Sequence, residues 1–381
     1  MASGLRVLHI TPSFYPALYW GGPTTSLYQL CNHLAADSQV DLRVLTTDSN
    51  GPKAGDRFTV EQRNSANYPG YRVTFCRKLL GRDFTPEIWA RAWPAIAWAD
   101  VVHLTAVYSN PTLPSLAAVK ALRKPLVWSP RGSLQRWSGT RNVVAKRIWN
   151  RTCELLTPGR TVLHVTSNGE ASESRLAIRH IKTEIIPNGI DIPALPTNRK
   201  WCPDGVVRLL YLGRLDPIKG IENLLEALAL LGTNSFNLRI CGEGDAAYTE
   251  HLRRIANELR VANNVYFVGP ISGREKDEAF ANSDVCVVPS HRENFGLVVA
   301  EAMAYGLPVI AGHGTPWEEL DSRGAGLWVK NDPRSLANAL HKLRGLNLAA
   351  MGRKGRSWMS SGYDWRSISK RFRSLYESLL R

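Results

Sequence analysis

Short apolar runs alternate with longer amphipathic segments along the whole chain. In the first half such runs predict strands at Leu5–Thr11, Val40–Thr46, Val73–Cys76, Val101–Leu104, Pro125–Ser129, Thr161–Thr166 and Glu184–Pro187. The second half repeats the plan at Val206–Gly213, Phe236–Cys241, Val265–Val268, Val285–Pro289 and Pro308–Ala311. Helical patterns lie between them, for example at Thr24–Ala36, Ile88–Trp98 and Asn142–Leu156. Strands that alternate with helices of about 10–15 residues predict an α/β fold with doubly wound parallel sheets.

The length favours two domains, because 381 residues exceed what one hydrophobic core usually serves. The segment Pro187–Pro203 is rich in Pro, Gly and Asn and is the best candidate for a linker. We therefore predict a first Rossmann-like domain over residues 1–186, a linker over 187–204 and a second such domain over 205–362. A ligand cleft between two such halves would lie at the carboxyl ends of the strands.

Composition is that of an ordinary globular protein, with 44% hydrophobic and 21% charged residues. A strand begins almost at the N-terminus, which leaves no room for a signal peptide, and no apolar run reaches 18 residues. The six cysteines lack the paired spacing of metal sites, so we expect buried free thiols and a cytoplasmic location.

The positive charge is concentrated in the first half. Residues 1–190 contain 23 Lys and Arg against 12 Asp and Glu, whereas the remainder contains 25 against 21. A basic face on the first domain suits anionic lipid, a phosphorylated acceptor or nucleic acid. The charge alone does not choose between these partners.

Two carboxylates in the second half form the most informative pattern. Glu293 follows a buried strand, and Glu301 lies eight residues later in a helix that is predicted to begin near Gly296. Asn294 and Phe295 bring unpaired backbone N–H groups to that helix N-terminus, where the helix dipole favours an anion such as a diphosphate. Carboxylates suit sugar and ribose hydroxyls, since each accepts two or more hydrogen bonds. The layout indicates a nucleotide-sugar site.

Two other strand-to-helix loops carry related chemistry. Arg214 and Lys219 follow the first strand of the second half, and two cations at this position would straddle a diphosphate, although two solvated surface charges are the alternative. Gly21 and Gly22 precede a helix that Pro23 suits, and glycines let a backbone approach a phosphate. A plain structural turn explains these glycines equally well.

Six motifs in order resemble glycosyltransferase family 4, the retaining transferases of the two-domain GT-B fold. They are GGP at 21–23, IPNGID at 186–191, LGRLDPIKG at 212–220, ICGEGD at 240–245, FVGPIS at 267–272 and PSHRENFGLVVAEAMAYGLPVI at 289–310. The resemblance covers nearly the whole chain and is densest from Val206 to Val329. It implies an acceptor-binding first domain, a donor-binding second domain and a C-terminal helix over 363–381 that packs back onto the first.

The resemblance also implies a role for each matching residue. Arg214 and Lys219 would bind the donor diphosphate and stabilise it as leaving group. The E-x7-E pair would hold the donor sugar through Glu293 and the nucleotide ribose through Glu301. The remaining donor-binding positions are Gly22, Ile271 near the base, and the loop Asn294, Phe295 and Gly296. The donor would be a UDP-, GDP- or ADP-sugar, and no tightly bound cofactor is implied.

The sequence departs from the family at one loop. Many relatives carry a histidine after the fifth strand of the acceptor half, where this chain has Arg131. A guanidinium stays charged and cannot act as a base, but it could bind an acceptor phosphate or a sugar hydroxyl. His103, near the end of the fourth strand, is a second candidate for cleft chemistry, and a hydrogen-bonded histidine at a strand terminus is equally plausible.

These residues predict front-face transfer with retention of configuration. The chain has no Asp-x-Asp motif of the kind that holds a divalent ion, so the two cations and the helix amides would meet the charge of the leaving nucleotide, with no metal strictly required. No carboxylate stands out as a nucleophile, because both acids are assigned to binding. Catalysis would then rest on Arg214, Lys219 and Glu293.

The acceptor is predicted to be a glycan or a lipid-linked glycan. Basic and large apolar residues alternate irregularly between Arg131 and Arg151, namely Arg136, Trp137, Arg141, Lys146, Arg147, Ile148 and Trp149. In a separate helix, Trp89 and Trp93 share one face. This pattern suits peripheral binding to an anionic membrane, whereas core tryptophans beneath a solvated basic face are the alternative. A cell-surface polysaccharide, lipopolysaccharide or exopolysaccharide pathway would use such an enzyme.

Three functions other than sugar transfer fit the sequence less well. A sugar-nucleotide epimerase with the GT-B fold would share the cleft but need no acceptor. A basic nucleic-acid-binding protein is less favoured, since no recognition module accompanies the charge. A nicotinamide enzyme is disfavoured because no G-x-G-x-x-G opens either half.

Overall fold

The computed structural model describes residues 4–81, 83–135, 143–195, 199–202, 205–232 and 235–381, which form two compact units. Asn142, Arg136, Trp137 and Arg141 lie outside the described residues, as do parts of the predicted linker. The first unit comprises residues 1–189 and 365–381, and the second comprises residues 190–364. Trp201 and Ile190, which fall in the segment predicted as a linker, pack against the core of the second unit.

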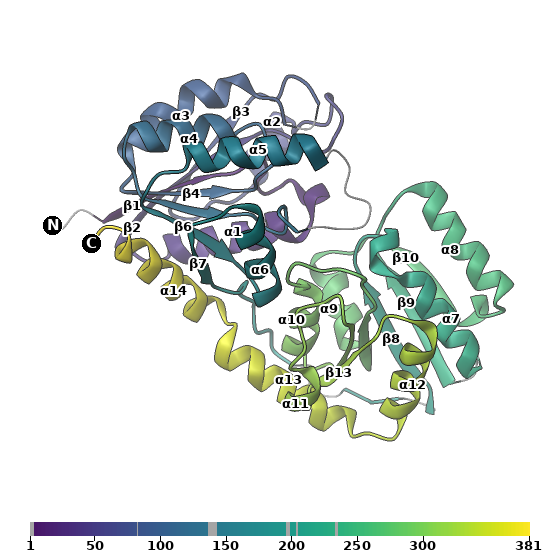
Figure 1. Cartoon of the computed structure of the whole chain (residues 1–381). Helices are drawn as coiled ribbons and strands as arrows, with labels where there is room; N and C mark the ends of the chain where they lie inside the picture. Colours follow the sequence, from purple (N-terminus) through teal and green to yellow (C-terminus); the bar gives the residue numbers. More distant parts are fainter. Residues whose placement is uncertain (1–3, 82, 136–142, 196–198, 203–204, 233–234) are drawn as a thin grey trace. The chain divides into compact units, whose positions relative to one another are not determined.

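The first unit contains a parallel seven-stranded sheet in the order β3-β2-β1-β4-β5-β6-β7 (Figure 1). Its strands are β1 Leu5–Ile10, β2 Val40–Thr47, β3 Arg72–Cys76, β4 Val101–Thr105, β5 Leu126–Ser129, β6 Thr161–Val165 and β7 Lys182–Ile185. Its helices are η1 Leu18–Trp20, α1 Gly22–Ala35, α2 Val60–Ser65, α3 Pro86–Trp98, α4 Thr112–Ala121, α5 Val143–Leu156, α6 Asn168–Ala177 and α14 Trp365–Ser378.

The second unit repeats this topology with six parallel strands in the order β10-β9-β8-β11-β12-β13. Its strands are β8 Val207–Leu212, β9 Phe236–Cys241, β10 Val265–Gly269, β11 Val285–Val288, β12 Val309–Gly312 and β13 Gly326–Val329. Its helices are η3 Pro217–Lys219, α7 Ile221–Leu231, α8 Ala246–Glu258, η5 Ala262–Asn264, α9 Gly273–Ala281, α10 Leu297–Ala304, α11 Leu320–Arg323, α12 Pro333–Arg344 and α13 Leu348–Gly362. Both sheets therefore have the doubly wound order predicted from the sequence.

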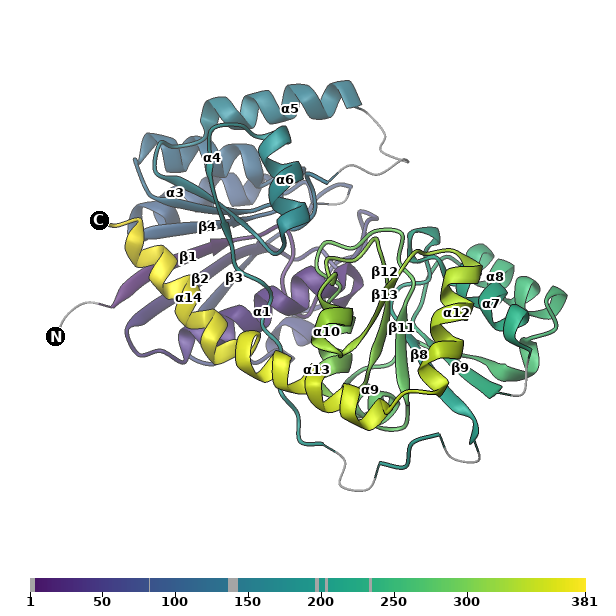
Figure 2. The same cartoon turned by 60° about the horizontal axis from the view of Figure 1, so that its bottom comes forward.

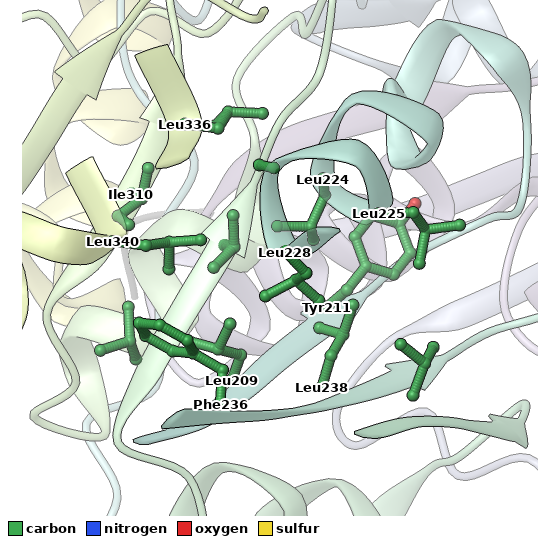
Figure 3. Packing of buried hydrophobic residues seen from close by; sticks show 14 of the residues in the cluster. Leu209, Tyr211, Leu224, Leu225, Leu228, Phe236, Leu238, Ile310, Leu336 and Leu340 are labelled. Atoms are coloured by element: carbon green, nitrogen blue, oxygen red, sulfur yellow. The ribbon is translucent and has the colours of Figure 1, made fainter. Parts of the chain in front are cut away.

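Helices cover both faces of each sheet. In the first unit α3, α4 and α5 pack on one face, and α1 and α14 pack on the other (Figures 1 and 2). In the second unit α7, α8 and α12 cover one face, while α9, α10, α11 and α13 cover the other. Figure 3 shows Leu209 and Tyr211 of β8 packed against leucines of α7. Because both faces of each sheet are buried, the central strands are continuous apolar runs in which apolar and polar residues do not alternate.

The predicted strands are all present, with ends shifted by one or two residues. Strand β13 and helix α13 are among the elements that were not predicted. Strand β13 is only four residues long and begins with glycine, so it gave no clear signal. Helix α13 contains Gly352 and Gly355, which lower helix propensity. Packing explains both glycines, because a Cβ on Gly352 would lie 1.9 Å from the carbonyl oxygen of Gly306 and one on Gly355 would lie 3.1 Å from Met303.

The C-terminal helix α14 completes the first unit. Its apolar face buries Ile368, Phe372, Leu375 and Tyr376 against α1 and the central strands. The Arg373 guanidinium on its other side pairs with Asp37 at 2.6 Å. Helix α14 is thus part of the core of this unit, although some 175 residues of the second unit separate it from the rest in sequence.

A continuous chain of hydrogen bonds runs beneath α14 across four neighbouring strands. The chain joins Cys31 to His9 (3.8 Å), His9 to Tyr376 (3.1 Å), Tyr376 to His103 (2.8 Å), His103 to Ser129 (2.6 Å), Ser129 to His164 (2.6 Å) and His164 to the Ile186 carbonyl (2.8 Å). All six side chains are buried. Since the carbonyl can only accept, His164 must carry its proton on Nε2, and every donor before it is then fixed in turn. Each histidine is neutral, with the proton on Nε2.

Burial supports this protonation state. Burial, followed by the positive charge of Arg131, lowers the pKa of His9 and of His164 to about 3. Burial also holds the pKa of His103 well below its usual range. A proton added to Nδ1 of any ring would face another donor and break the chain. The folded state therefore binds fewer protons than the unfolded state below the normal histidine pKa.

We predict that the first unit loses stability as the pH falls from about 6.5 towards 3. Each neutral histidine contributes about 1.4 kcal/mol per pH unit in this window, and its contribution is fully present above the unfolded-state pKa. Urea unfolding at several pH values measures the slope. The amide of His9→Gln can occupy the position of the histidine Nε2. This variant should lower the slope of unfolding free energy against pH by the equivalent of about one proton, and His251→Gln, at an exposed histidine, is the control. Equal slopes for His9→Gln and wild type would contradict the assignment.

Candidate active site

Two of the predicted donor loops of the second unit meet at one point of its sheet. Strands β8 and β11 are neighbours in the sheet, although strands β9 and β10 lie between them in the sequence, and the helices after β8 and β11 cover opposite faces. This is the point where the strand order reverses, and in folds of this kind ligands bind in the crevice between the loops on either side. The loop with Arg214 and Lys219 follows β8, and the loop with Glu293 follows β11.

Backbone contacts hold these two loops together. The His291 amide donates to the Ile218 carbonyl at 2.8 Å, and the Asn331 side chain donates to the Pro289 carbonyl. Gly220 has φ 63° and lies so close that a Cβ would be 2.3 Å from the Pro289 oxygen. Such a position admits only glycine, because a side chain would be strained and would also clash with backbone. The geometry of the crevice is thus set by the main chain.

Lys219 and Glu293 form an ion pair across the crevice. The Lys219 Nζ lies 2.6 Å from Glu293 Oε1, and both side chains are less than one fifth exposed. The Ser290 hydroxyl donates to the same oxygen at 2.9 Å, and the Glu293 amide donates to the Gly314 carbonyl at 2.8 Å. The carboxylate is therefore fixed by a cation, a hydroxyl and its own backbone.

Tyr211 supports the loop that carries Arg214 and Lys219. Its ring is buried in the core under α7, and its hydroxyl donates to the Arg214 carbonyl at 2.7 Å. Burial, followed by the negative charge of Glu293, raises the pKa of Tyr211 well above its usual value. The Arg214 side chain is exposed, and within the described part of the chain its guanidinium has no ion-pair partner. It is available to an anion at the mouth of the crevice.

The loop from Asn294 to Gly296 leads into α10 as predicted. Gly296 has φ 73° and is the N-cap of α10, and the Phe295 carbonyl accepts a hydrogen bond from the Trp317 indole at 2.6 Å. Trp317 and Phe295 are both buried, and their rings are in edge contact. Packing under this loop thus fixes the direction of the first amides of α10.

Glu301 and Ile271 lie on neighbouring elements of the same unit. Glu301, in α10, pairs with Lys276 of α9 at 2.6 Å, and its side chain is 14% exposed. Ile271 follows β10 and packs, half-buried, against the core beneath α9 and α10. The structure thus gives each acid of the predicted pair its own lysine, and neither acid is bonded to the other.

Three residues predicted for the first half lie around its own switch point, between β1 and β4. A cavity of about 270 Å³ opens there, lined by segments that follow β1, β2, β4 and β5. Arg131 lines it with a partly buried guanidinium that donates to Asn188 Oδ1 at 2.5 Å. Its Nε and the Thr105 hydroxyl are buried without a hydrogen-bond partner among the described residues. Both groups can bind a ligand in this cavity.

Gly22 and His103 differ in their surroundings. Gly22 begins α1 between two residues of the cavity wall, and no atom lies within 4 Å of a Cβ built on it, so packing does not require glycine there. His103 is fully buried, and both ring nitrogens are engaged by Tyr376 and Ser129. The structure therefore favours the second interpretation of His103, a hydrogen-bonded histidine within a strand.

Sequence reasoning missed four residues that shape the candidate site. Tyr211, Ser290, Asn331 and Lys276 support the loops or bond the predicted acids. Ser290 lies inside a quoted motif and could have been noticed as a donor to Glu293. Lys276 precedes its partner by 25 residues in a different helix, and no local spacing indicates such a pair.

Comparisons with known proteins identify the family. The model for "Glycosyltransferase Family 4" matches residues 20–193, and the model for "Glycosyl transferases group 1" matches residues 202–358. A GDP-mannose-dependent alpha-(1-6)-phosphatidylinositol monomannoside mannosyltransferase of Mycolicibacterium smegmatis is 28% identical over 64% of this chain and 72% of its own length. A D-inositol 3-phosphate glycosyltransferase of Catenulispora acidiphila is 35% identical over 36% of this chain and 35% of its length.

Solved structures share the fold over almost the whole chain. The Anabaena protein HepE, crystallised with UDP and glucose, superposes with a TM-score of 0.78 at 18% identity and covers 98% of this chain and 100% of its own. By contrast, the first curated relatives match over only 35–43% of their own length. Two doubly wound sheets and two family models side by side show that this chain belongs to the group 1 and family 4 glycosyltransferases of the GT-B fold.

Proposed function

We propose that this protein transfers a hexosyl-type sugar from a nucleotide-sugar donor to a glycan or lipid-linked glycan, with retention of configuration. The observation that carries the proposal is the Lys219–Glu293 pair at the switch point of the second sheet. In a nucleotide sugar the terminal phosphate is bonded to the anomeric carbon. A cation for that phosphate and an acid for the sugar hydroxyls must therefore be neighbours, as these two side chains are.

The remaining residues of the second unit fit the same donor. Arg214 offers an exposed guanidinium beside the pair, and the first amides of α10 add a partial positive charge. Glu301 would accept hydrogen bonds from the ribose, with Lys276 holding its carboxylate in place. The UDP and glucose bound by HepE support a nucleotide-sugar donor for this chain. The base is not decided by these contacts, so UDP-, GDP- and ADP-sugars all remain candidates.

The proposed mechanism stabilises the leaving nucleotide and uses no enzyme nucleophile. The bond between the anomeric carbon and the phosphate oxygen breaks, and Arg214, Lys219 and the α10 amides meet the charge that develops on the phosphate. Both predicted acids are already engaged by lysines, so neither is placed as a free nucleophile. The departing phosphate oxygen would take the proton from the acceptor hydroxyl, which attacks from the same face. These fixed charges would replace a divalent ion, and we expect turnover to persist in EDTA.

We predict that Lys219→Met lowers kcat about 10²–10³-fold, because it removes one partner of the developing phosphate charge. A thermal-shift panel of nucleotide sugars first identifies the donor that raises the Tm of the wild type. Turnover of that donor is then compared in wild type, Lys219→Met and Lys342→Met, an exposed lysine of α12 that serves as control. Near-normal turnover in a folded Lys219→Met protein would remove this lysine from the site.

We predict that the product keeps the anomeric configuration of the donor. In the proposed mechanism neither Glu293 nor Glu301 acts as a nucleophile, so the acceptor attacks from the side that the phosphate leaves. NMR of the new glycosidic linkage formed from an α-linked donor measures this directly. An inverted product would exclude the proposed mechanism. Release of a free epimerised sugar without any acceptor would instead indicate the sugar-nucleotide epimerase that the sequence left as an alternative.

The first unit presents a surface suited to an anionic membrane, and we include peripheral binding in the proposal. On α3, Trp89 and Trp93 are 41% and 47% exposed, and on α5, Val144 and Ile148 are 72% and 64% exposed. Both helices belong to the layer that covers one face of the first sheet (Figure 2). The bases of α5 lie among these apolar side chains, which is the composition of interfacial helices. Within the described residues, no helix has the length and apolarity needed to cross a bilayer.

We predict that the protein sediments with anionic phosphatidylserine vesicles and that this binding falls sharply as salt is raised from 50 to 500 mM. Trp89→Ser/Trp93→Ser should weaken it, since these rings would enter the interface. Tyr266→Ser, a change at an exposed aromatic residue of the second unit, is the control. Equal binding to neutral and anionic vesicles would contradict a role for the basic helix.

A further inference from the structure

A groove between α5 and α6 adjoins the cavity of the first unit and contains bases of α5. Its volume is about 590 Å³, and its walls come from α5, from the end of α6 and from the segment 133–135 after β5. Four cations line it: Lys146, Arg147, Arg151 and Arg179. The positive charge that the sequence concentrates in residues 1–190 is thus partly gathered in one concave surface.

One carboxylate opposes these four cations. Glu154 accepts a hydrogen bond from the Arg179 amide at 2.8 Å, and Arg151, whose side chain is 79% exposed, lies 3.5 Å away. Lys146 lies above the ring of Tyr108, which does not neutralise it. Among the described residues, the side chains of Arg147 and Arg179 have no hydrogen-bond or ion-pair partner. The groove therefore keeps a net positive charge that no contact among the described residues accounts for.

The groove also contains an unsatisfied polar atom. Asn150, which lines it from α5, has a buried Oδ1 without a hydrogen-bond partner among the described residues. A buried acceptor without a partner is unfavourable in a native protein, so such an atom points to a ligand or water that supplies the donor. The groove thus offers one acceptor for a hydroxyl beside four cations for an anion.

The groove is continuous with the cavity at the switch point of the same unit. Tyr108 and Ser133 line both, and Arg131 lies in the cavity wall. Tyr108 and Lys146 also border a third hollow of about 390 Å³ that contains Phe84 and Trp149. A ligand with one end in the cavity can therefore extend past Tyr108 into the cationic groove.

We infer that this groove binds a phosphate or diphosphate group of the acceptor, while the sugar to be extended lies in the cavity beside Arg131. This inference rests on the proposed function and names the class of its acceptor. Arginines are suited to phosphate because the guanidinium fork donates two parallel hydrogen bonds. The Asn150 oxygen would accept a hydrogen bond from a hydroxyl of the attached sugar.

The phosphate has two chemical sources, which the walls of the groove allow us to separate. A lipid carrier would add an alkyl chain next to the diphosphate, and a phosphorylated glycan would not. Val143 and Leu176 line the groove and are 57% and 71% exposed, so an alkyl chain has apolar surface to cover. Inorganic diphosphate and geranyl diphosphate are probes that share the anion and differ in the chain.

Isothermal titration of the full-length protein with inorganic diphosphate tests the inference. Arg147→Glu/Arg179→Glu should weaken one class of binding site about tenfold or more, since charge-assisted hydrogen bonds are lost and repulsion is added. Arg72→Glu/Arg160→Glu, exposed arginines away from the groove, changes the net charge equally and should leave this site intact. Unchanged diphosphate affinity in the groove variant would overturn the inference.

Two further arms separate this inference from the proposed donor site. Lys219→Met should remove a different class of diphosphate site, so its failure to do so would count against the donor assignment and leave the groove untouched. Geranyl diphosphate should bind more tightly than diphosphate only if the carrier is a lipid, and Val143→Asn/Leu176→Asn should then abolish the gain. If the two probes bind equally and Arg147→Glu/Arg179→Glu weakens both, the result would support a phosphorylated glycan as the acceptor.

Discussion

The ion pair between Lys219 and Glu293 is the interaction on which the candidate site depends. It joins the loops after β8 and β11 across the point where the strand order of the second sheet reverses. Both groups are largely buried, so each needs a partner when no donor is present. A nucleotide sugar offers replacements for both at once, a phosphate for the lysine and hydroxyls for the acid. The pair therefore keeps the site in shape without donor and can be exchanged for donor contacts.

The fold could be predicted from the sequence because its signals are local. Central strands that are buried on both faces appear as apolar runs, and the regular alternation with helices leaves a doubly wound parallel sheet as the simplest arrangement. The elements that were missed depend on tertiary contacts. Helix α13 has glycines that weaken it in isolation, yet Gly352 is required by the approach of the Gly306 carbonyl. Propensity and packing disagree at such positions, and packing decides the structure.

The candidate site could be predicted only in part, for the same physical reason. Arg214, Lys219, Glu293 and Gly296 lie in loops at strand ends, where topology brings them together and motif spacing is informative. The residues that hold them, such as Tyr211 and Lys276, act over long sequence separations. His103 shows how little a residue type decides by itself. Its place near a strand end left cleft chemistry and a hydrogen-bonded histidine equally open, and its two bonded nitrogens favour the second.

The two units differ in how completely they satisfy their own polar groups, and this difference bears on what each one binds. In the second unit, backbone contacts such as that at Gly220 fix the loops, and the predicted acids are already paired. In the described part of the first unit, Arg131 Nε and the Asn150 oxygen are buried without partners, and Arg147 and Arg179 have no counter-charge. A site that is paired in isolation exchanges partners when its ligand binds, whereas a site with unpaired groups gains contacts that it lacked. Acceptor binding should therefore stabilise the first unit more than donor binding stabilises the second at equal contact area.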